Sequence, residues 1–209
     1  MSEDDEWKEL EMQLLRKYKN INNKYKLIYA DPPWQFRVWS NRGKDRSAEK
    51  HYPVMTLEDI KNLDVKSISD DNCMLLMWAT YPNLEEAFEV IKSWGFKYKT
   101  VAFTWAKKTK NDKWHIGLGY WTRHNPEICL LATKGKPKRK SKSVRNLVVS
   151  KIRKHSEKPK EIYDYIEELV DGPYIELFAR NKRDGWDSWG NELENDIKLN
   201  IIKIKDKKK

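Results

Sequence analysis

The chain has 209 residues and a formal net charge of +10, and 39% of its residues are hydrophobic. This length suits one domain of ordinary size. The spacing of the two cysteines, Cys73 and Cys129, and of the four histidines argues against a disulfide framework and against a metal site. No apolar run approaches the roughly 20 residues of a membrane span, and the acidic start lacks a signal-peptide pattern, so we expect a cytoplasmic, nucleoid or nuclear protein without a membrane partner.

The first predicted element is an amphipathic helix over residues 1–24, in which Trp7, Leu10 and Leu14 recur at helical spacing. We expect this helix to pack on a main domain over residues 25–193, which a basic tail over residues 194–209 follows.

Within the main domain, apolar runs of strand length alternate with helical patterns. Strands are predicted at residues 25–30, 73–79, 98–105, 127–133, 146–152 and 174–179, and helices at residues 57–63, 83–94 and 159–170. The runs CMLLMWA and YIELFA are nearly continuously apolar, which is typical of strands covered on both faces. The pattern predicts a three-layer α/β fold with a mostly parallel, doubly wound sheet.

Asp31, Pro32, Pro33 and Trp34 follow the first predicted strand directly, in the stretch YADPPW. Ligands of open α/β sheets bind beyond the carboxyl ends of the strands, so this position favours a functional role. The prolines fix backbone torsions and donate no backbone hydrogen bond, so the polar groups of the turn are acceptors. Such a turn suits an amine with two donor hydrogens, and Trp34 adds a flat face on which the ring bearing that amine would stack.

The exocyclic amine of adenine fits this description. Two acceptors that hold its hydrogens would favour a pyramidal nitrogen and direct its lone pair at an electrophile, such as the methyl group of a sulfonium cofactor. An amine that is paired in a duplex would first have to be turned out of the stack or presented single-stranded. The alternative is an ordinary Asx-Pro-Pro turn that ends a strand.

Ten tryptophans are distributed along the chain. Trp78 and Trp105 lie in apolar runs and are expected in the core, whereas Trp34, Trp39 and Trp114 lie among polar residues, where a ring face is available to a base. Trp114 belongs to a long irregular segment over residues 107–121, and loops of that length in a compact domain are usually functional or disordered.

The net charge comes from one segment. Residues 134–154 hold ten Lys or Arg and no Asp or Glu, which leaves 32 basic and 32 acidic residues elsewhere. Concentrated positive charge attracts nucleic acid because binding releases counterions. We therefore predict that the segment grips phosphates through Lys138, Arg139, Lys140 and Arg145; a solvated loop without a ligand is the alternative.

Eight blocks along the chain resemble the methyltransferase-A seventy-kilodalton-subunit family, the adenine-N6 methyltransferases with an Asp-Pro-Pro-Trp signature. In order, they are YADPPW, HYPVMTLEDI, MLLMWAT, WGFKYKTVAFTWAK, GLGYWTRHNPEICLLATKG, EKPKEIYDYIEEL, YIELFAR and WDSWGNEL. The resemblance implies a Rossmann-like class I methyltransferase fold with a permuted motif order, with S-adenosylmethionine as methyl donor.

The resemblance also implies roles for single residues. Asp31 and Pro32 would hold the target amine, with Pro33 completing the signature, Trp34 stacking on the base and the Asp31 charge near the sulfonium. Further matched positions are Tyr52 in a loop that closes over the site, Glu127 on the substrate side, Lys158 and Glu176 near the cofactor, Phe178 along it, and Arg180, Asn191 and Glu192 around its ribose. The larger RNA-modifying members often have Gln at the position of Glu192, so the ribose contacts here differ from theirs.

The sequence thus predicts an adenine-N6 methyltransferase acting on nucleic acid. DNA is favoured over RNA because the chain looks like a compact catalytic domain without recognition extensions. The alternatives are an RNA adenine-N6 methyltransferase, a cytosine-N4 methyltransferase and a catalytically silent nucleic-acid-binding partner of an active homologue, although silent members commonly lose the signature. A homodimer or a heterodimer with a related subunit is compatible with the sequence.

Overall fold

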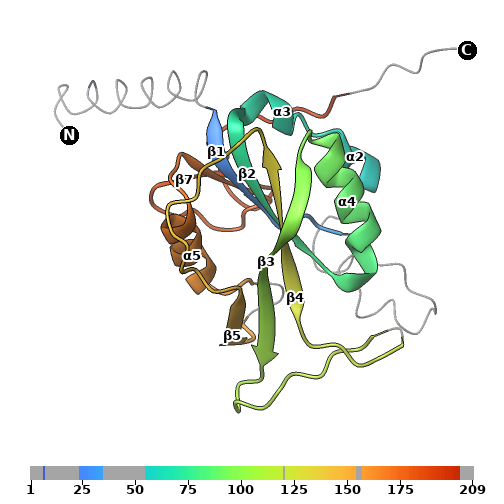
Figure 1. The fold of residues 1–209 in the computed structure, drawn as a ribbon. Helices are drawn as coiled ribbons and strands as arrows, with labels where there is room; N and C mark the ends of the chain where they lie inside the picture. Colours follow the sequence, from blue (N-terminus) through green and yellow to red (C-terminus); the bar gives the residue numbers. More distant parts are fainter. Residues whose placement is uncertain (1–6, 8–23, 35–54, 120, 154–156, 203–209) are drawn as a thin grey trace, which may run out of the picture.

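The computed structural model describes Trp7 and residues 24–34, 55–119, 121–153 and 157–202. Seven strands form one sheet in the order β5-β3-β4-β2-β1-β6-β7 (Figure 1). Their bounds are β1 (Tyr25–Ala30), β2 (Ser69–Ala79), β3 (Lys97–Lys108), β4 (Glu127–Lys134), β5 (Leu147–Lys151), β6 (Tyr174–Leu177) and β7 (Trp186–Trp189). The predicted N-terminal helix, apart from Trp7 and Lys24, and the predicted site residue Tyr52 lie outside the described residues.

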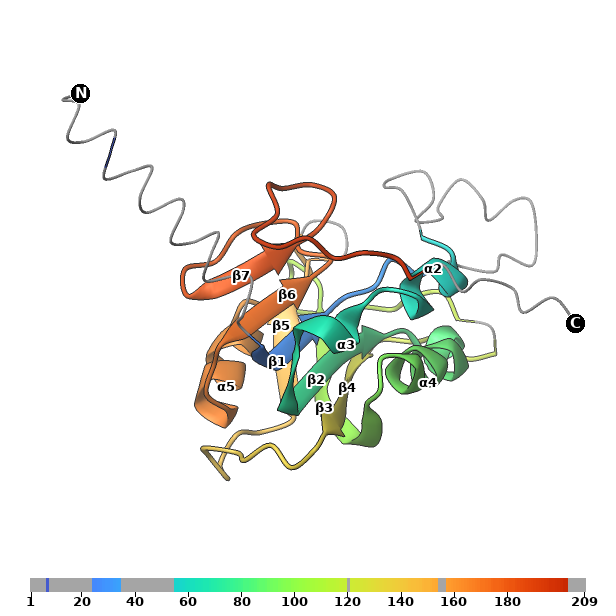
Figure 2. The ribbon, with the colours of Figure 1, turned by 90° about the horizontal axis from the view of Figure 1, so that it is seen from above.

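Helices cover both faces of this sheet, as the sequence predicted. α2 (Leu57–Lys61), α3 (Val65–Ile68) and α4 (Leu84–Ser93) lie on one face, and the short η3 (Tyr81–Asn83) leads into α4. α5 (Glu161–Leu169) lies on the other face, and Figure 2 shows the three layers from above. No helix among the described residues is long and apolar enough to cross a membrane.

The central strand β2 contributes to both halves of the core, because successive side chains of a strand point to opposite faces. Leu75 and Met77 pack in the layer that contains Val90 of α4, and Leu76 packs in the layer that contains Ile162 of α5. All five side chains are fully buried. This two-sided burial explains the continuous apolar run, and Trp78 and Trp105 are buried as predicted, at 1% and 3% exposed.

The sheet is mostly parallel, as predicted, but the sequence did not indicate which strand runs the other way. β4 runs antiparallel to both of its neighbours, β2 and β3, whereas all other neighbouring pairs are parallel. An apolar run specifies burial but not direction, so the orientation of β4 is invisible in its sequence. β7 was also missed, because WDSW has only four residues and does not alternate apolar with polar side chains.

The described part of the predicted tail packs on the domain. Ile197 is buried in the core beside α2 and α4, and Ile201 forms an antiparallel bridge with Leu63. The backbone N–H of Ile202 donates to the carbonyl of Asn62 at 2.7 Å. Residues up to 202 therefore belong to the folded unit, beyond the boundary at residue 193 that the sequence suggested.

Strand register brings several turns to one edge of the sheet. Ala30, the last residue of β1, pairs with Met77 of β2 and with Leu177 of β6. Because β4 is antiparallel, its first residue, Glu127, lies at this same edge, one position beyond the pair of Ile128 with Ala79. The edge thus gathers the carboxyl ends of parallel strands and the amino end of β4.

Substitution of Trp94 would test the packing between α4 and α2. Its side chain is fully buried, and its indole N–H donates to the carbonyl of Ile60 at 2.8 Å. We expect Trp94→Ala to lower the free energy of unfolding by about 3 to 5 kcal/mol, measured by urea denaturation. Trp121→Ala is the control: its side chain is 99% exposed, so its free energy of unfolding should change by less than about 0.5 kcal/mol. Equal losses in the two variants would contradict this packing.

Candidate active site

The signature turn follows β1 at the edge where these strand ends meet. The N–H of Trp34 donates to the carbonyl of Pro32 at 2.8 Å, which closes a three-residue turn. The indole N–H of Trp34 donates to the carbonyl of Trp78, the penultimate residue of β2, at 3.0 Å. These two bonds fix the direction of the Pro32 carbonyl, which keeps a lone pair for a second donor.

Trp34 differs from the prediction in one respect. Its side chain is only 7% exposed and packs in the core layer on the α4 side of the sheet. The indole therefore anchors the turn and forms part of the wall of the site, and it does not present a freely accessible face. The sequence could not show this, because a tryptophan among polar neighbours is compatible with either environment.

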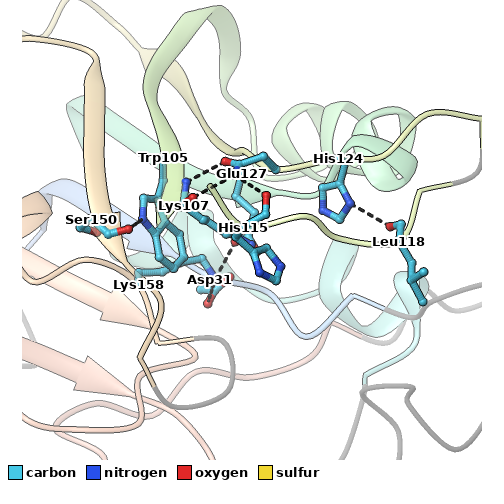
Figure 3. A network of polar contacts seen from close by, with 10 residues as sticks. Asp31, Trp105, Lys107, His115, Leu118, His124, Glu127, Ser150 and Lys158 are labelled. Carbon is cyan, nitrogen blue, oxygen red and sulfur yellow. Dashed lines mark hydrogen bonds and ion pairs between the residues drawn. The ribbon is translucent and has the colours of Figure 1, made fainter. Parts of the chain in front are cut away.

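Four charged side chains form a connected cluster behind the turn (Figure 3). Lys158 Nζ lies 2.5 Å from Asp31 Oδ2 and 3.5 Å from Glu127 Oε2. Lys107, near the end of β3, donates to Glu127 Oε1. The side chains of Lys158, Glu127 and Asp31 are 9%, 17% and 24% exposed, so the cluster is largely withdrawn from water, with Asp31 the most accessible.

The cluster gives its two carboxylates different proton affinities. Burial raises the pKa of Asp31 above its ordinary value, although Lys158 acts in the opposite direction. Burial alone would also raise the pKa of Glu127, but the charges of Lys158 and Lys107 hold it below its ordinary value. Burial disfavours a charged Lys158, yet Asp31 and Glu127 together raise its pKa. Lys158 therefore stays an ammonium, and Asp31 accepts a proton more readily than Glu127 does.

A cavity opens over this cluster and brings together most of the predicted site. Its lining comprises Asp31, Pro32, Pro33, Trp34, Trp78, Ala79, Thr80, Glu127, Lys158, Phe178, Ala179, Arg180, Asn191 and Glu192. Sequence reasoning missed Thr80, which directly follows β2, and Lys107, which supports Glu127 from behind. The position of Thr80 after a buried strand was a usable signal, whereas nothing near Lys107 in the sequence indicates its partner.

The turns after β6 and β7 form the opposite wall of the cavity. Phe178 has a left-handed backbone with φ of 63°, a strained conformation for a large side chain. Its ring contacts that of Trp189 at 5.5 Å between centroids. Gly190 permits the close approach of the two turns, because a Cβ there would lie 2.0 Å from the carbonyl oxygen of Ala179. Beyond it, Glu192 lies 3.7 Å from the guanidinium of Arg180.

The structure does not bring the predicted phosphate contacts to this cavity. β4 ends at Lys134, which pairs with Cys73 at the opposite edge of the sheet from Glu127. From there the chain runs past the end of α5, where Lys140 contacts Asp171 at 3.1 Å and the carbonyl of Glu167 at 2.9 Å. Lys138, Arg139 and Arg145 are exposed along the same segment and do not line the cavity.

Glu176 also lies outside the cavity lining. Its carboxylate accepts a hydrogen bond from the hydroxyl of Tyr163 at 2.9 Å, between β6 and α5. Burial, together with the nearby charge of Asp31, raises the pKa of Glu176 from 4.5 to about 7. Its position next to β1, where it pairs with Tyr29, makes it a neighbour of the cluster.

The sequence of this chain is similar to those of known methyltransferases. A family model described as MT-A70 matches residues 25–192. The type II methyltransferase M.MunI of Mycoplasma sp is 39% identical, over 85% of this chain and 81% of its own. The N(6)-adenosine-methyltransferase catalytic subunit METTL3 of Homo sapiens is 30% identical over 84% of this chain, which spans only 29% of METTL3. A putative MT-A70-like N(6)-adenosine-methyltransferase of Medicago truncatula is 31% identical, over 83% of this chain and 27% of its own.

The mostly parallel sheet, the acidic turn at the end of β1 and these similarities define the class as a Rossmann-like methyltransferase. Within that class, the chain belongs to the MT-A70 family, whose model covers most of its length.

Glu176 predicts a pH dependence of stability. Because its pKa is higher in the folded protein than the ordinary value of 4.5, the folded state holds the proton more tightly, and stability falls as pH rises from about 4.5 to about 7. Glu176→Gln removes this loss. We expect its free energy of unfolding, relative to wild type, to rise by on the order of 2 kcal/mol between pH 5 and pH 8.

The measurement is urea denaturation at both pH values. Glu85→Gln, which changes an exposed carboxylate on α4, should keep the pH profile of the wild type. A constant difference between Glu176→Gln and wild type across this range would show that the carboxyl of Glu176 does not titrate there.

Proposed function

We propose that the protein transfers a methyl group from S-adenosylmethionine to the N6 amine of adenine in nucleic acid, with DNA as the substrate. The single observation that carries this proposal is the pair of acceptors at the cavity, the Asp31 carboxylate and the Pro32 carbonyl, held rigidly beside the buried Lys158. Membership in the MT-A70 family and similarity to named methyltransferases support the reaction type.

The residues around the cavity fit the proposed donor. Glu192 and Asn191 supply acceptors and a donor for the vicinal hydroxyls of a ribose, and Phe178 supplies an apolar surface. Arg180 and Lys158 are cationic partners for a carboxylate, and the negative charge of Asp31 suits a sulfonium. When bound, the sulfonium cofactor supplies an electrophilic methyl group.

The chain itself contributes orientation and a proton acceptor. Asp31 and the Pro32 carbonyl accept the two hydrogens of the amine and thereby fix the direction of the nitrogen lone pair. Trp34, buried and bonded to Trp78, prevents the turn from moving away. The methylated nitrogen must release one proton. Asp31 is the better acceptor, because its pKa lies above its ordinary value whereas that of Glu127 is lowered.

Sequence identity to the relatives favours DNA over RNA as the substrate. The chain is 39% identical to a type II methyltransferase over most of both lengths, but about 30% identical to short parts of enzymes named for adenosine, the ribonucleoside. The intact acceptor pair disfavours a silent partner subunit, since Asp31 and Pro32, the residues proposed to hold the amine, both line the cavity.

The function is tested by offering labelled S-adenosylmethionine together with matched single- and double-stranded DNA and RNA, followed by mass spectrometry of the nucleosides. The expected product is N6-methyladenine in DNA. N6-methyladenosine in RNA alone would reassign the substrate. N4-methylcytosine, or no product with any of the four substrates, would overturn the proposal.

Asp31→Asn tests the mechanism. The amide cannot take up the proton at this position and loses the charge that complements the amine and the sulfonium, so we expect methyl transfer to fall at least about 100-fold. Binding of S-adenosylmethionine should be measured separately by calorimetry. Asp71→Asn, an exposed residue near the start of β2 and away from the cavity, is the matched control and should keep wild-type activity. Full activity of Asp31→Asn would refute the role of Asp31.

A further inference from the structure

The connection between β3 and β4 is a second surface with unusual chemistry. Its described residues are 109–119 and 121–126, hereafter the β3–β4 loop, and Figure 1 shows it extending beyond the sheet. Trp114, Ile116, Leu118 and Trp121 are 59%, 73%, 66% and 99% exposed on it. A group of large apolar side chains in water marks an interaction site more often than a lone exposed residue does.

The β3–β4 loop is held in a defined conformation by its own polar contacts. The side chain of Asn125 accepts from the N–H of Lys107 at 2.7 Å and donates to the carbonyls of Lys107 and His115 at 2.9 and 2.6 Å. Farther out, the N–H of Gly117 donates to the carbonyl of His124 at 2.7 Å. The part of the loop that carries Trp114 is thus held in a fixed conformation, which reduces the entropy lost on binding.

The same loop also carries exposed positive charge. Lys110, Lys113 and Arg123 are exposed, and Asp112 is the one acidic residue in the described part of the β3–β4 loop. Asp112 lies 3.6 Å from Lys108, whose ammonium also lies 4.4 Å from the centre of the Trp114 ring. The surface therefore combines aromatic faces with uncompensated cations.

The same residues connect this surface to the active site. Lys107, which Asn125 holds through both backbone groups, donates to Glu127 of the buried cluster. Asp31 and Glu127 both contact Lys158, and Glu127 also contacts Lys107 (Figure 3). Asn125 bonds both Lys107 and the carbonyl of His115. The β3–β4 loop therefore leaves the sheet at the edge that carries the cavity, whereas the segment around Lys140 lies at the opposite edge.

We propose that the β3–β4 loop binds an unstacked strand of nucleic acid next to the target base, with Trp114 and Trp121 stacking on bases and Lys110, Lys113 and Arg123 contacting phosphates. This inference rests on the proposed function and adds where the substrate strand runs. Aromatic faces combined with a positive surface are the features that bind single strands, because an unpaired base exposes its ring face whereas a paired base hides it.

The charge pattern favours nucleic acid over a second copy of this chain. Two copies that met through this surface in a twofold dimer would bring the same cations, Lys110, Lys113 and Arg123, toward one another. Juxtaposed like charges disfavour such an interface, whereas phosphates complement them. The shallow recess lined by Trp114, His115, Ile116, Arg123, His124 and Asn125 likewise pairs an apolar wall with a cation.

The test measures binding of a fluorescent single-stranded DNA oligonucleotide to the full chain, together with molar mass by light scattering. We expect Trp114→Ala and Trp121→Ala each to weaken binding about tenfold. Lys110→Glu combined with Lys113→Glu should weaken binding further and reduce its salt dependence. Lys97→Glu combined with Lys99→Glu is the charge-matched control, since both lysines are exposed at the far end of β3, and it should bind more tightly than the loop variant.

Several outcomes would overturn the inference. One is unchanged affinity in the tryptophan variants. Another is loss of binding only after Lys138→Glu combined with Arg139→Glu, which would show that the basic segment over residues 134–154 contacts the phosphates instead. A lower affinity that accompanies a fall in molar mass would assign the surface to a second copy. If the wild type binds no oligonucleotide and methylates none, the proposed function fails; if it does both and the loop variants match it, only this inference fails.

Discussion

The ion pair between Lys158 and Asp31 is the contact on which the site depends. It joins two segments that are 127 positions apart in the chain, and Glu127 extends it to β4. Two buried carboxylates without a cation would repel each other and lose hydration, so Lys158 is required for both to remain ionised in this position. Lys107 distinguishes the two carboxylates, because it places a second ammonium beside Glu127.

The antiparallel direction of β4 determines which side chains lie beside the Lys158–Asp31 ion pair. A parallel β4 would place its first residue, Glu127, at the edge where the other strands begin, far from Asp31. Reversal brings Glu127 to the edge where β1 and β2 end, and it also turns the β3–β4 loop toward that edge. One strand direction thus supplies both the second carboxylate of the cluster and the exposed aromatic surface beside it.

The tryptophans show how tertiary structure divides residues that look alike in sequence. Trp34 and Trp114 both lie among polar and turn-forming neighbours, and both were expected to offer a ring to a base. Trp34 is 7% exposed and holds the signature turn against β2, whereas Trp114 is 59% exposed on the β3–β4 loop. The difference arises from what surrounds each ring, a packed sheet for Trp34 and mostly solvent for Trp114, and the sequence next to each tryptophan does not show it.

The sequence by itself determined the strand and helix pattern, the three-layer arrangement and the acceptor turn after β1, because periodicity and proline chemistry are local properties. Similarity along most of the chain also indicated Lys158, Phe178, Arg180, Asn191 and Glu192, and all five line the cavity. Only the tertiary structure decided the direction of β4, the support of Glu127 by Lys107 and the pairing of Lys140 with Asp171 at the far edge. These depend on which segments meet in space, and electrostatic partners brought together by sheet register leave no pattern in the linear order of residues.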